Sequence, residues 1–317
     1  MPLRLALEWF ARHGGVLLAA GIFAGLLTPP LAAAMRDVVT PSVAGLTTLV
    51  LLRIDPAQVL GYLRRPVLVT ALLAWVLLAS PVLAFAVARL TGLDPALAAG
   101  LVIMATGPAA ISSPAFARMV GLDGEVSLVV AVLSTLLVPF TAPPLALGLL
   151  GIDLSISVPA LMGRLALLVG MPLALAVLIR RMTPPVVLDR WGKAVDGTVV
   201  LLVVIFGFGI MDGVLARLLA APGFVLGGAA LAFGGSFALN AAAALAFRAA
   251  GQPLGLTAGL LSGNRNTALF FAVLPAATDP KILLFFALCQ FPLFLTPFLL
   301  RPFYRRLNRK DPGRTIG

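Results

Sequence analysis

Apolar segments of about 20 residues follow one another along this chain, and they restrict its fold more than any other feature. A helix of that length crosses the hydrocarbon core of a bilayer. Within lipid, only helices and closed barrels satisfy all of their backbone hydrogen bonds. We therefore expect an all-α polytopic membrane protein with a single membrane domain over residues 1–317. Its ten expected spans are 15–34, 38–53, 66–89, 95–118, 125–150, 157–180, 197–218, 222–249, 254–276 and 281–302.

The composition agrees with a membrane domain and offers little for an enzyme. The 317 residues are 61% hydrophobic and 11% charged, whereas soluble domains carry roughly 25% charged residues. The single cysteine, Cys289, has no partner for a disulfide, and with the single histidine, His13, it is too little for a metal cluster. A nucleophilic serine needs a base beside it, yet His13 precedes the spans and no lysine falls in the middle of one. We therefore expect no catalytic residue, no metal site and no cofactor.

The 23 Lys and Arg residues are distributed unevenly between the two sides of the membrane. If the N-terminus is cytoplasmic, most of them fall on the cytoplasmic side, including those of a tail over 303–317. The opposite side receives Arg36, Arg89, Arg217 and Lys281. Because cytoplasmic loops are enriched in Lys and Arg, we expect both termini to be cytoplasmic in a bacterial inner (plasma) membrane. Orientation in the lipid bilayer therefore accounts for the net charge of +11, and we expect no nucleic-acid partner.

Two short sequence patterns occur once in each half of the chain. The matching segments are Arg89 to Pro95 with Arg248 to Pro253, and Phe140 to Leu145 with Phe294 to Leu299. We therefore expect two repeats of five spans, over 15–150 and 157–302. An odd number of spans inverts the second repeat relative to the first. Inverted repeats are typical of secondary transporters, which bind their substrate near the bilayer midplane.

Helix-breaking and polar residues interrupt two corresponding spans. In span 95–118, Gly107-Pro108 precedes Ser112-Ser113-Pro114, and each proline removes a helical hydrogen bond. In span 254–276, the run 262–267 reads SGNRNT, in which Gly263 weakens the helix. Interrupted segments at matching positions of two halves are the best sequence indication of a transporter site. The predicted substrate-binding residues are Arg265, Asn264, Asn266, Thr267, Ser112 and Ser113.

Arg265 is the costliest of these residues, since an arginine at the centre of a membrane helix costs about 2.5–3.5 kcal/mol on insertion scales. One interpretation is a functional guanidinium. The other is a structural arginine bound to backbone carbonyls. A separate alternative for span 95–118 is that Ser112 and Ser113 bond back to their own helix and Pro114 only kinks it. Asp212 is expected at the membrane interface. Asn240 and Gln290 are expected to bridge helices.

The chain resembles the bile acid:sodium symporter (BASS) family. The resemblance rests on Gly61 to Pro66, Gly107-Pro108 with Ser112-Ser113, Ser134-Thr135 with Pro139, and Gly263 to Asn266. It implies ten helices in two inverted repeats, with spans 4 and 9 broken and crossing. Spans 3–5 and 8–10 would form a core and spans 1, 2, 6 and 7 a panel. A small organic anion would bind between them and cross the membrane by movement of the core against the panel.

The sequence departs from the family at the positions that the resemblance assigns to sodium ligands. A glutamate and a glutamine of span 9 are replaced by Leu261 and Arg265, and a glutamine of span 3 by Val76. In span 5, Ser127 matches one hydroxyl and Ala131 replaces the other. The oxygen ligands left for a coupling Na⁺ are those of Ser112, Ser113, Ser127, Asn264 and Asn266. None of them is charged, although hard cations usually bind a carboxylate. We hypothesise that Arg265 replaces a bound cation or pairs with an anionic substrate.

The sequence is also compatible with other functions. One is a proton-coupled or uncoupled exporter or antiporter of the same fold, for which Asp212 is the candidate acid. Arsenite export is disfavoured because Cys289 lies in span 10 rather than span 4. Another is a membrane sensor without transport, although a sensor has no need of matched broken helices. The sequence predicts no particular oligomeric state.

Overall fold

The computed structural model describes residues 2–308 except 56, 58, 60, 62–64, 152, 153 and 276. The described part is helical throughout. Its helices are α1 (Pro2–Leu27), α2 (Pro29–Met35), α3 (Val39–Arg53), α5 (Pro66–Ala74), α6 (Ser80–Thr91), α7 (Pro95–Thr106), α8 (Ser113–Val120), α9 (Gly124–Leu150), α10 (Val158–Met182), α11 (Pro185–Ile210), α12 (Val214–Ala220), α13 (Pro222–Ala246), α14 (Gln252–Gly263), α15 (Ala268–Val273) and α16 (Pro280–Asn308). Short turns η1 (Arg36–Val38) and η3 (Arg248–Ala250) and the π-helical η2 (Trp75–Ala79) connect some of them.

The expectation of a polytopic helical membrane protein is confirmed. Among the described residues, six helices are long and apolar enough to cross a membrane, and up to eight if two bent pairs each count as one span. The bent pairs are Leu3–Gly14 with Val16–Leu27, and Pro280–Thr296 with Phe298–Leu307. Ten spans therefore stay a prediction. Residues 62–64 of the 61–66 motif and residues 309–317 of the expected tail lie outside the described residues.

Local chemistry explains where several helices begin and end. Asp94 caps α7 by accepting from Ala96 N at 2.9 Å, and Asp123 caps α9 by accepting from Glu125 N and Val126 N at 2.9 Å. A carboxylate at this position satisfies backbone N–H groups that have no helical partner. Gly92 and Gly121 end α6 and α8 with φ of 62° and 81°, which is the left-handed conformation that glycine adopts most easily.

Three expected spans have wrong boundaries. The first span, 15–34, is split because Pro29 forces Thr28 out of the helical conformation (ψ 69°), so α1 ends at Leu27. The seventh span, 197–218, begins earlier, at Pro185, and ends at Ile210, after which Gly213 adopts a φ of 75°. The last helix continues through Asn308, so the first residues of the expected tail over 303–317 are helical.

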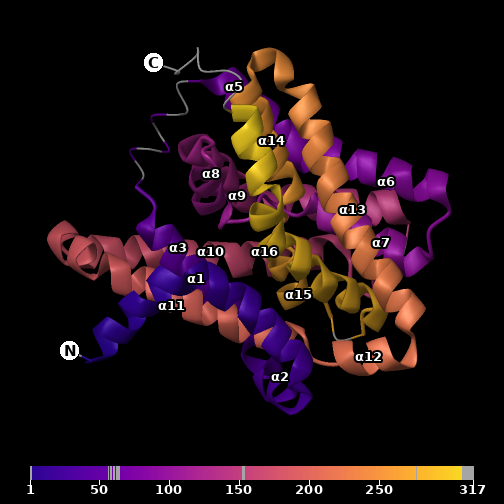
Figure 1. Cartoon of the computed structure of the whole chain (residues 1–317), viewed down its shortest axis with the longest axis horizontal. Coiled ribbons are helices and arrows are strands. Elements are labelled where there is room, and N and C mark those ends of the chain that lie inside the picture. Colours follow the sequence, from indigo (N-terminus) through magenta and orange to yellow (C-terminus); the bar gives the residue numbers. More distant parts are fainter. Residues whose placement is uncertain are drawn as a thin grey trace.

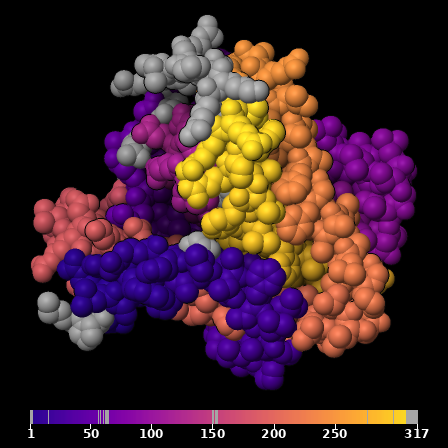
Figure 2. Space-filling view, in the orientation of Figure 1, coloured from indigo at the N-terminus to yellow at the C-terminus, as the bar shows by residue number. Residues whose placement is uncertain are grey.

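The helices form two groups that pack against each other. The panel layer consists of α1, α3, α10 and α11, which lie across the lower left of Figure 1. The core layer consists of α5–α9 and α13–α16, of which α13, α14 and α16 run steeply on the right. Figure 2 shows α1 as a band along the lower face, directly below α16. The two groups contain the helices that the resemblance assigns to panel and core.

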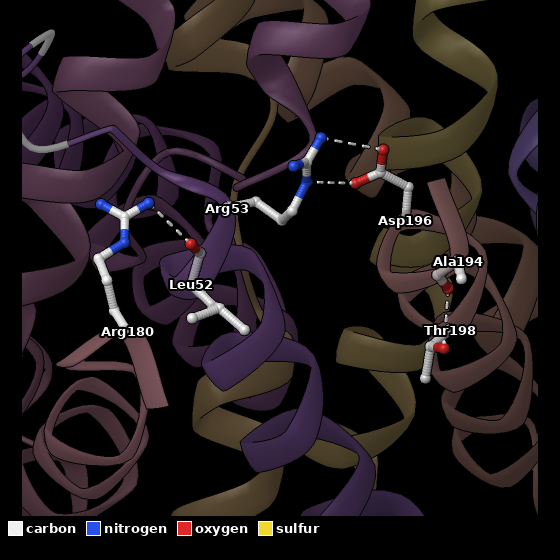
Figure 3. Close-up of polar contacts among 6 residues, drawn as sticks. All are labelled: Leu52, Arg53, Arg180, Ala194, Asp196 and Thr198. Atoms are coloured by element: carbon white, nitrogen blue, oxygen red, sulfur yellow. Dashed lines mark hydrogen bonds and ion pairs between the residues drawn. The ribbon is translucent and has the colours of Figure 1, made fainter. Parts of the chain in front are cut away.

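Polar contacts hold the panel layer together at one end (Figure 3). Arg53 at the end of α3 donates from Nε and Nη2 to the carboxylate of Asp196 in α11, at 3.0 and 3.4 Å. Arg180 of α10 donates from Nη2 to Leu52 O at 3.0 Å, which satisfies a carbonyl at the C-terminus of α3. Because α11 begins at Pro185, a residue type favoured in the first turn of a helix, it includes Asp196, which hydropathy placed outside the span.

Candidate functional site

Two helices of the core layer are interrupted at the positions that the sequence predicted. The first interruption, residues 107–112, separates α7 from α8, and the second, residues 264–267, separates α14 from α15. The first follows from Pro108, which disfavours the helical conformation at the preceding residue, and Gly107 accordingly has a ψ of 152°. The second begins at Asn264, which is extended (ψ 98°) directly after Gly263.

The two interruptions bind each other through their backbones. Ala110 N donates to Asn264 O, and Asn266 N donates to Pro108 O, both at 2.9 Å. They flank an antiparallel bridge between Ala109 and Arg265. Ala109 N donates to Ser134 Oγ of α9 at 3.2 Å. Two segments far apart in sequence therefore satisfy each other's freed backbone groups, and we call residues 107–112 and 264–267 the crossing.

Arg265 is buried in the crossing, with 3% of its surface exposed. Its Nε donates to Ser262 O at 2.7 Å, and its Nη1 donates to Val76 O at 2.8 Å and to Gly107 O at 3.0 Å. Its Nη2 lies 3.4 Å from Ser262 Oγ. None of the ion pairs between described residues includes Arg265. The guanidinium thus joins three interrupted helical segments, as the structural interpretation of this arginine proposed.

Local geometry explains why these three carbonyls are free to accept from a side chain. In the π-helical η2, Ser80 N donates to Trp75 O, and Pro81 has no N–H, so Val76 O lacks a helical donor. Asn266 N, which would reach Ser262 O in a continuous helix, donates to Pro108 O instead. Gly107 lies past the end of α7. Each of these three segments therefore leaves one carbonyl oxygen without a helical donor, and Arg265 donates to all three.

Hydroxyl and indole groups surround the same guanidinium. Ser262 Oγ accepts from Trp75 Nε1 at 3.1 Å and lies 3.2 Å from Ser80 Oγ. Ser236 of α13 donates to Gly263 O at 2.7 Å. Trp75, Ser80 and Ser236 are not among the site residues that the sequence predicts. The Ser80-Pro81 pair in the middle of an apolar run was the available signal, because a proline there interrupts the helix.

The other predicted site residues occupy two kinds of environment. Asn264 and Ser113 are 0% exposed, and neither side chain has a hydrogen-bond partner among the described residues. Ser112 and Asn266 are half-buried. Thr267 Oγ1 accepts from Gln290 Nε2 of α16 at 2.9 Å, which confirms that Gln290 bridges helices. The crossing thus carries both sealed and partly accessible polar groups.

Three further polar residues lie outside the crossing's hydrogen-bond network. Ser127 Oγ donates to Asp123 O in its own helix at 2.7 Å. Asn240 donates to Tyr304 Oη at 2.6 Å, so it bridges α13 and α16 as expected. Asp212 accepts from Arg36 Nη1 at 3.1 Å and is therefore not the counter-ion of Arg265.

An all-helical membrane protein whose two interrupted helices meet at their breaks has the architecture typical of membrane transporters. The sequence model of the Sodium Bile acid symporter family matches residues 40–214, more than half of the chain, and the chain belongs to this family. The protein is accordingly a multi-pass membrane protein of a transporter family, and members of that family are not enzymes. The match includes α7, α8 and α9, whereas Arg265 lies beyond it. No curated protein matches the chain.

Proposed function

We propose that this protein is a secondary transporter of a small organic anion and works by alternating access between the panel and core layers. In this proposal, residues 15–150 and 157–302 are two inverted repeats that supply ten spans, with both termini cytoplasmic in a bacterial inner membrane. The observation that carries the proposal is the crossing, where two interrupted helices place backbone and side-chain polar groups in the interior of the core layer. Such interruptions are where transporters bind their substrates.

In this proposal, Arg265 replaces a coupling cation. Its positive charge is held by carbonyl oxygens, the ligand type that a hard cation binds. The side-chain oxygens left for a sodium ion, such as those of Ser113 and Asn264, are uncharged. The residues present therefore do not fit a sodium ion beside Arg265. In this proposal the guanidinium of Arg265 provides the positive charge at this position at all times, and transport does not require sodium.

The hydrogen bonds of Arg265 favour cation replacement over direct binding of the substrate. A guanidinium binds a carboxylate best through two parallel N–H groups. In Arg265, Nε and both N–H groups of Nη1 already donate to carbonyls. The half-buried side chains of Ser112 and Asn266 remain accessible and donate to an anion in our proposal, while the charge of Arg265 stabilises that anion at longer range.

Flux measurements test the transport activity and its coupling. We would reconstitute the protein in liposomes and measure uptake of labelled small carboxylates in sodium and in potassium or choline. We expect equal uptake in all three salts, a large loss in Arg265→Gln and a smaller loss in Arg265→Lys. A strong sodium requirement would contradict cation replacement. Absence of flux for every carboxylate would contradict transport and favour a sensor.

Cross-linking tests the movement of the core against the panel. Thr40 of α3 and Ala272 of α15 belong to different layers, and Thr40 Oγ1 lies 3.5 Å from Ala272 O. A thiol cross-link between cysteines at these two positions should stop uptake and reduction should restore it. The matched control joins cysteines at Arg53 and Asp196, both in the panel layer, and should leave uptake unchanged. The native Cys289 is buried, so it should not react with the cross-linking reagent.

The alternative of proton coupling lacks support at its candidate group. Asp212 is paired with Arg36 and does not contact the crossing. We therefore expect a protonophore to leave anion uptake unchanged, apart from the effect of the membrane potential. Uptake that requires an inward pH gradient at constant potential would instead favour the proton-coupled alternative.

A further inference from the structure

A cleft of about 180 Å³ lies between the panel and core layers, and none of its lining residues belongs to the crossing. Arg36 of η1, Asp212 and Arg217 form its polar edge. Phe271 of α15 and Leu283 of α16 belong to its apolar wall. In Figure 1, α2 and α12 lie at the lower edge of the molecule, with α15 above them. We propose that this cleft is an entry site that binds a small monocarboxylate by its carboxylate group.

The charges at the edge favour an anion. Arg36 pairs with Asp212 at 3.1 Å, and this pair leaves the charge of Arg217 uncompensated. Among the described residues, the Arg217 side chain has no ion-pair or hydrogen-bond partner. The side chain of Arg36 is 62% exposed and donates to Asp212 from one nitrogen, so its other N–H groups are open to a ligand. Guanidinium groups match the geometry of a carboxylate.

The distribution of basic residues in the whole chain points to the same cleft. The predicted orientation places only four basic residues, Arg36, Arg89, Arg217 and Lys281, on the side opposite the cytoplasm. Basic residues on that side oppose the preferred orientation of a membrane protein. Two of the four line one cleft, where walls of low dielectric strengthen their field and attract anions.

The size of the cleft limits the ligand. A cavity of about 150 Å³ in another protein takes up benzene, so 180 Å³ holds a ring-sized apolar body, whereas a fused steroid would extend out of the cleft. The apolar wall of Phe271 and Leu283 suits such a body. We infer that the ligand is a monocarboxylate of about the size of benzoate. This inference rests on the proposed function, because it places the site on the boundary along which the two layers would move.

Binding measurements on the purified full-length protein test the site directly. The probes are benzoate, its neutral analogue benzamide, and cholate as a steroid carboxylate, titrated by calorimetry in detergent. We expect benzoate to bind and the other two to bind at least about tenfold more weakly. Arg217→Gln and Arg36→Gln should weaken benzoate binding about tenfold or more, since each removes a charge-assisted hydrogen bond. Asp212→Asn should tighten it, because it removes a competing carboxylate.

The matched control is Arg89→Gln, which removes a basic residue from the same predicted side without touching the cleft. It should bind benzoate as the unmodified protein does. Unchanged affinity in Arg217→Gln, or equal binding of benzamide, would overturn the proposal. Failure of the proposed function is a separate result: if no carboxylate enters liposomes but benzoate binding still depends on Arg217, the cleft stands as an anion site and transport does not.

Discussion

Replacing Arg265 by methionine tests whether the guanidinium holds the crossing together. The substitution keeps a long unbranched side chain but removes every donor, so three buried carbonyl oxygens lose a partner. A buried acceptor without a partner costs about 1–3 kcal/mol, which gives about 3–9 kcal/mol for three. Removal of a buried charge returns several kcal/mol of desolvation. We therefore expect the free energy of unfolding to fall by about 3 kcal/mol.

Arg164→Met is the matched control for this measurement. Arg164 also lies in a long apolar helix, α10, but it is exposed, and the bond it forms is from Nη1 to Val273 O at 3.0 Å. Its replacement should cost about 1 kcal/mol or less.

Thermal unfolding in detergent separates the two variants. With about 2 °C for each kcal/mol in a chain of this size, Arg265→Met should melt about 6 °C below the unmodified protein and Arg164→Met within about 2 °C of it. If Arg265→Met melts together with Arg164→Met, or above the unmodified protein, the guanidinium does not stabilise the crossing and our assignment of its role is wrong.

Three further outcomes are expected. The double variant Leu261→Glu/Arg265→Gln restores the side chains that the family resemblance places at these positions, and its uptake should become sodium-dependent; uptake that stays indifferent to sodium would contradict cation replacement. Gly263→Ala places a Cβ 2.7 Å from a backbone oxygen of α13 and should cost about 1–3 kcal/mol in thermal unfolding, whereas the control Gly234→Ala, whose Cβ meets nothing within 4 Å, should be neutral. Equal melting of these two would be evidence against the tight packing of α14 on α13. Asp196→Asn removes an exposed ion pair and should cost less than about 1 kcal/mol, with no cost left in high salt; a larger loss that persists in salt would show that the pair is shielded from solvent.

The sequence determined the features that depend on local chemistry. Long apolar runs predicted a helical membrane protein because lipid offers the backbone no other hydrogen-bond partner. Pro108 and Gly263 predicted both interruptions, because proline and glycine weaken a helix whatever its tertiary environment. The depth of Arg265 in an apolar run identified it as the residue to explain. Hydropathy was less successful at the start of α11, because it detects the apolar part of a helix and not the polar first turns, which begin at Pro185.

The partners of the interrupted segments follow from packing and not from the local sequence. The bonds from Arg265 to Val76 O and Gly107 O join residues 189 and 158 positions apart in the chain. Hydropathy and helix propensity depend on neighbouring residues only. They can predict where a helix is interrupted, but not which distant donor will bind the carbonyl oxygens at the interruption. The pairing of Arg36 with Asp212, and the cleft that leaves Arg217 uncompensated, likewise arise from helices brought together by packing. The local sequence shows which polar groups will lack a helical partner. The packed fold determines which partners they find, because it alone sets the distances between distant residues.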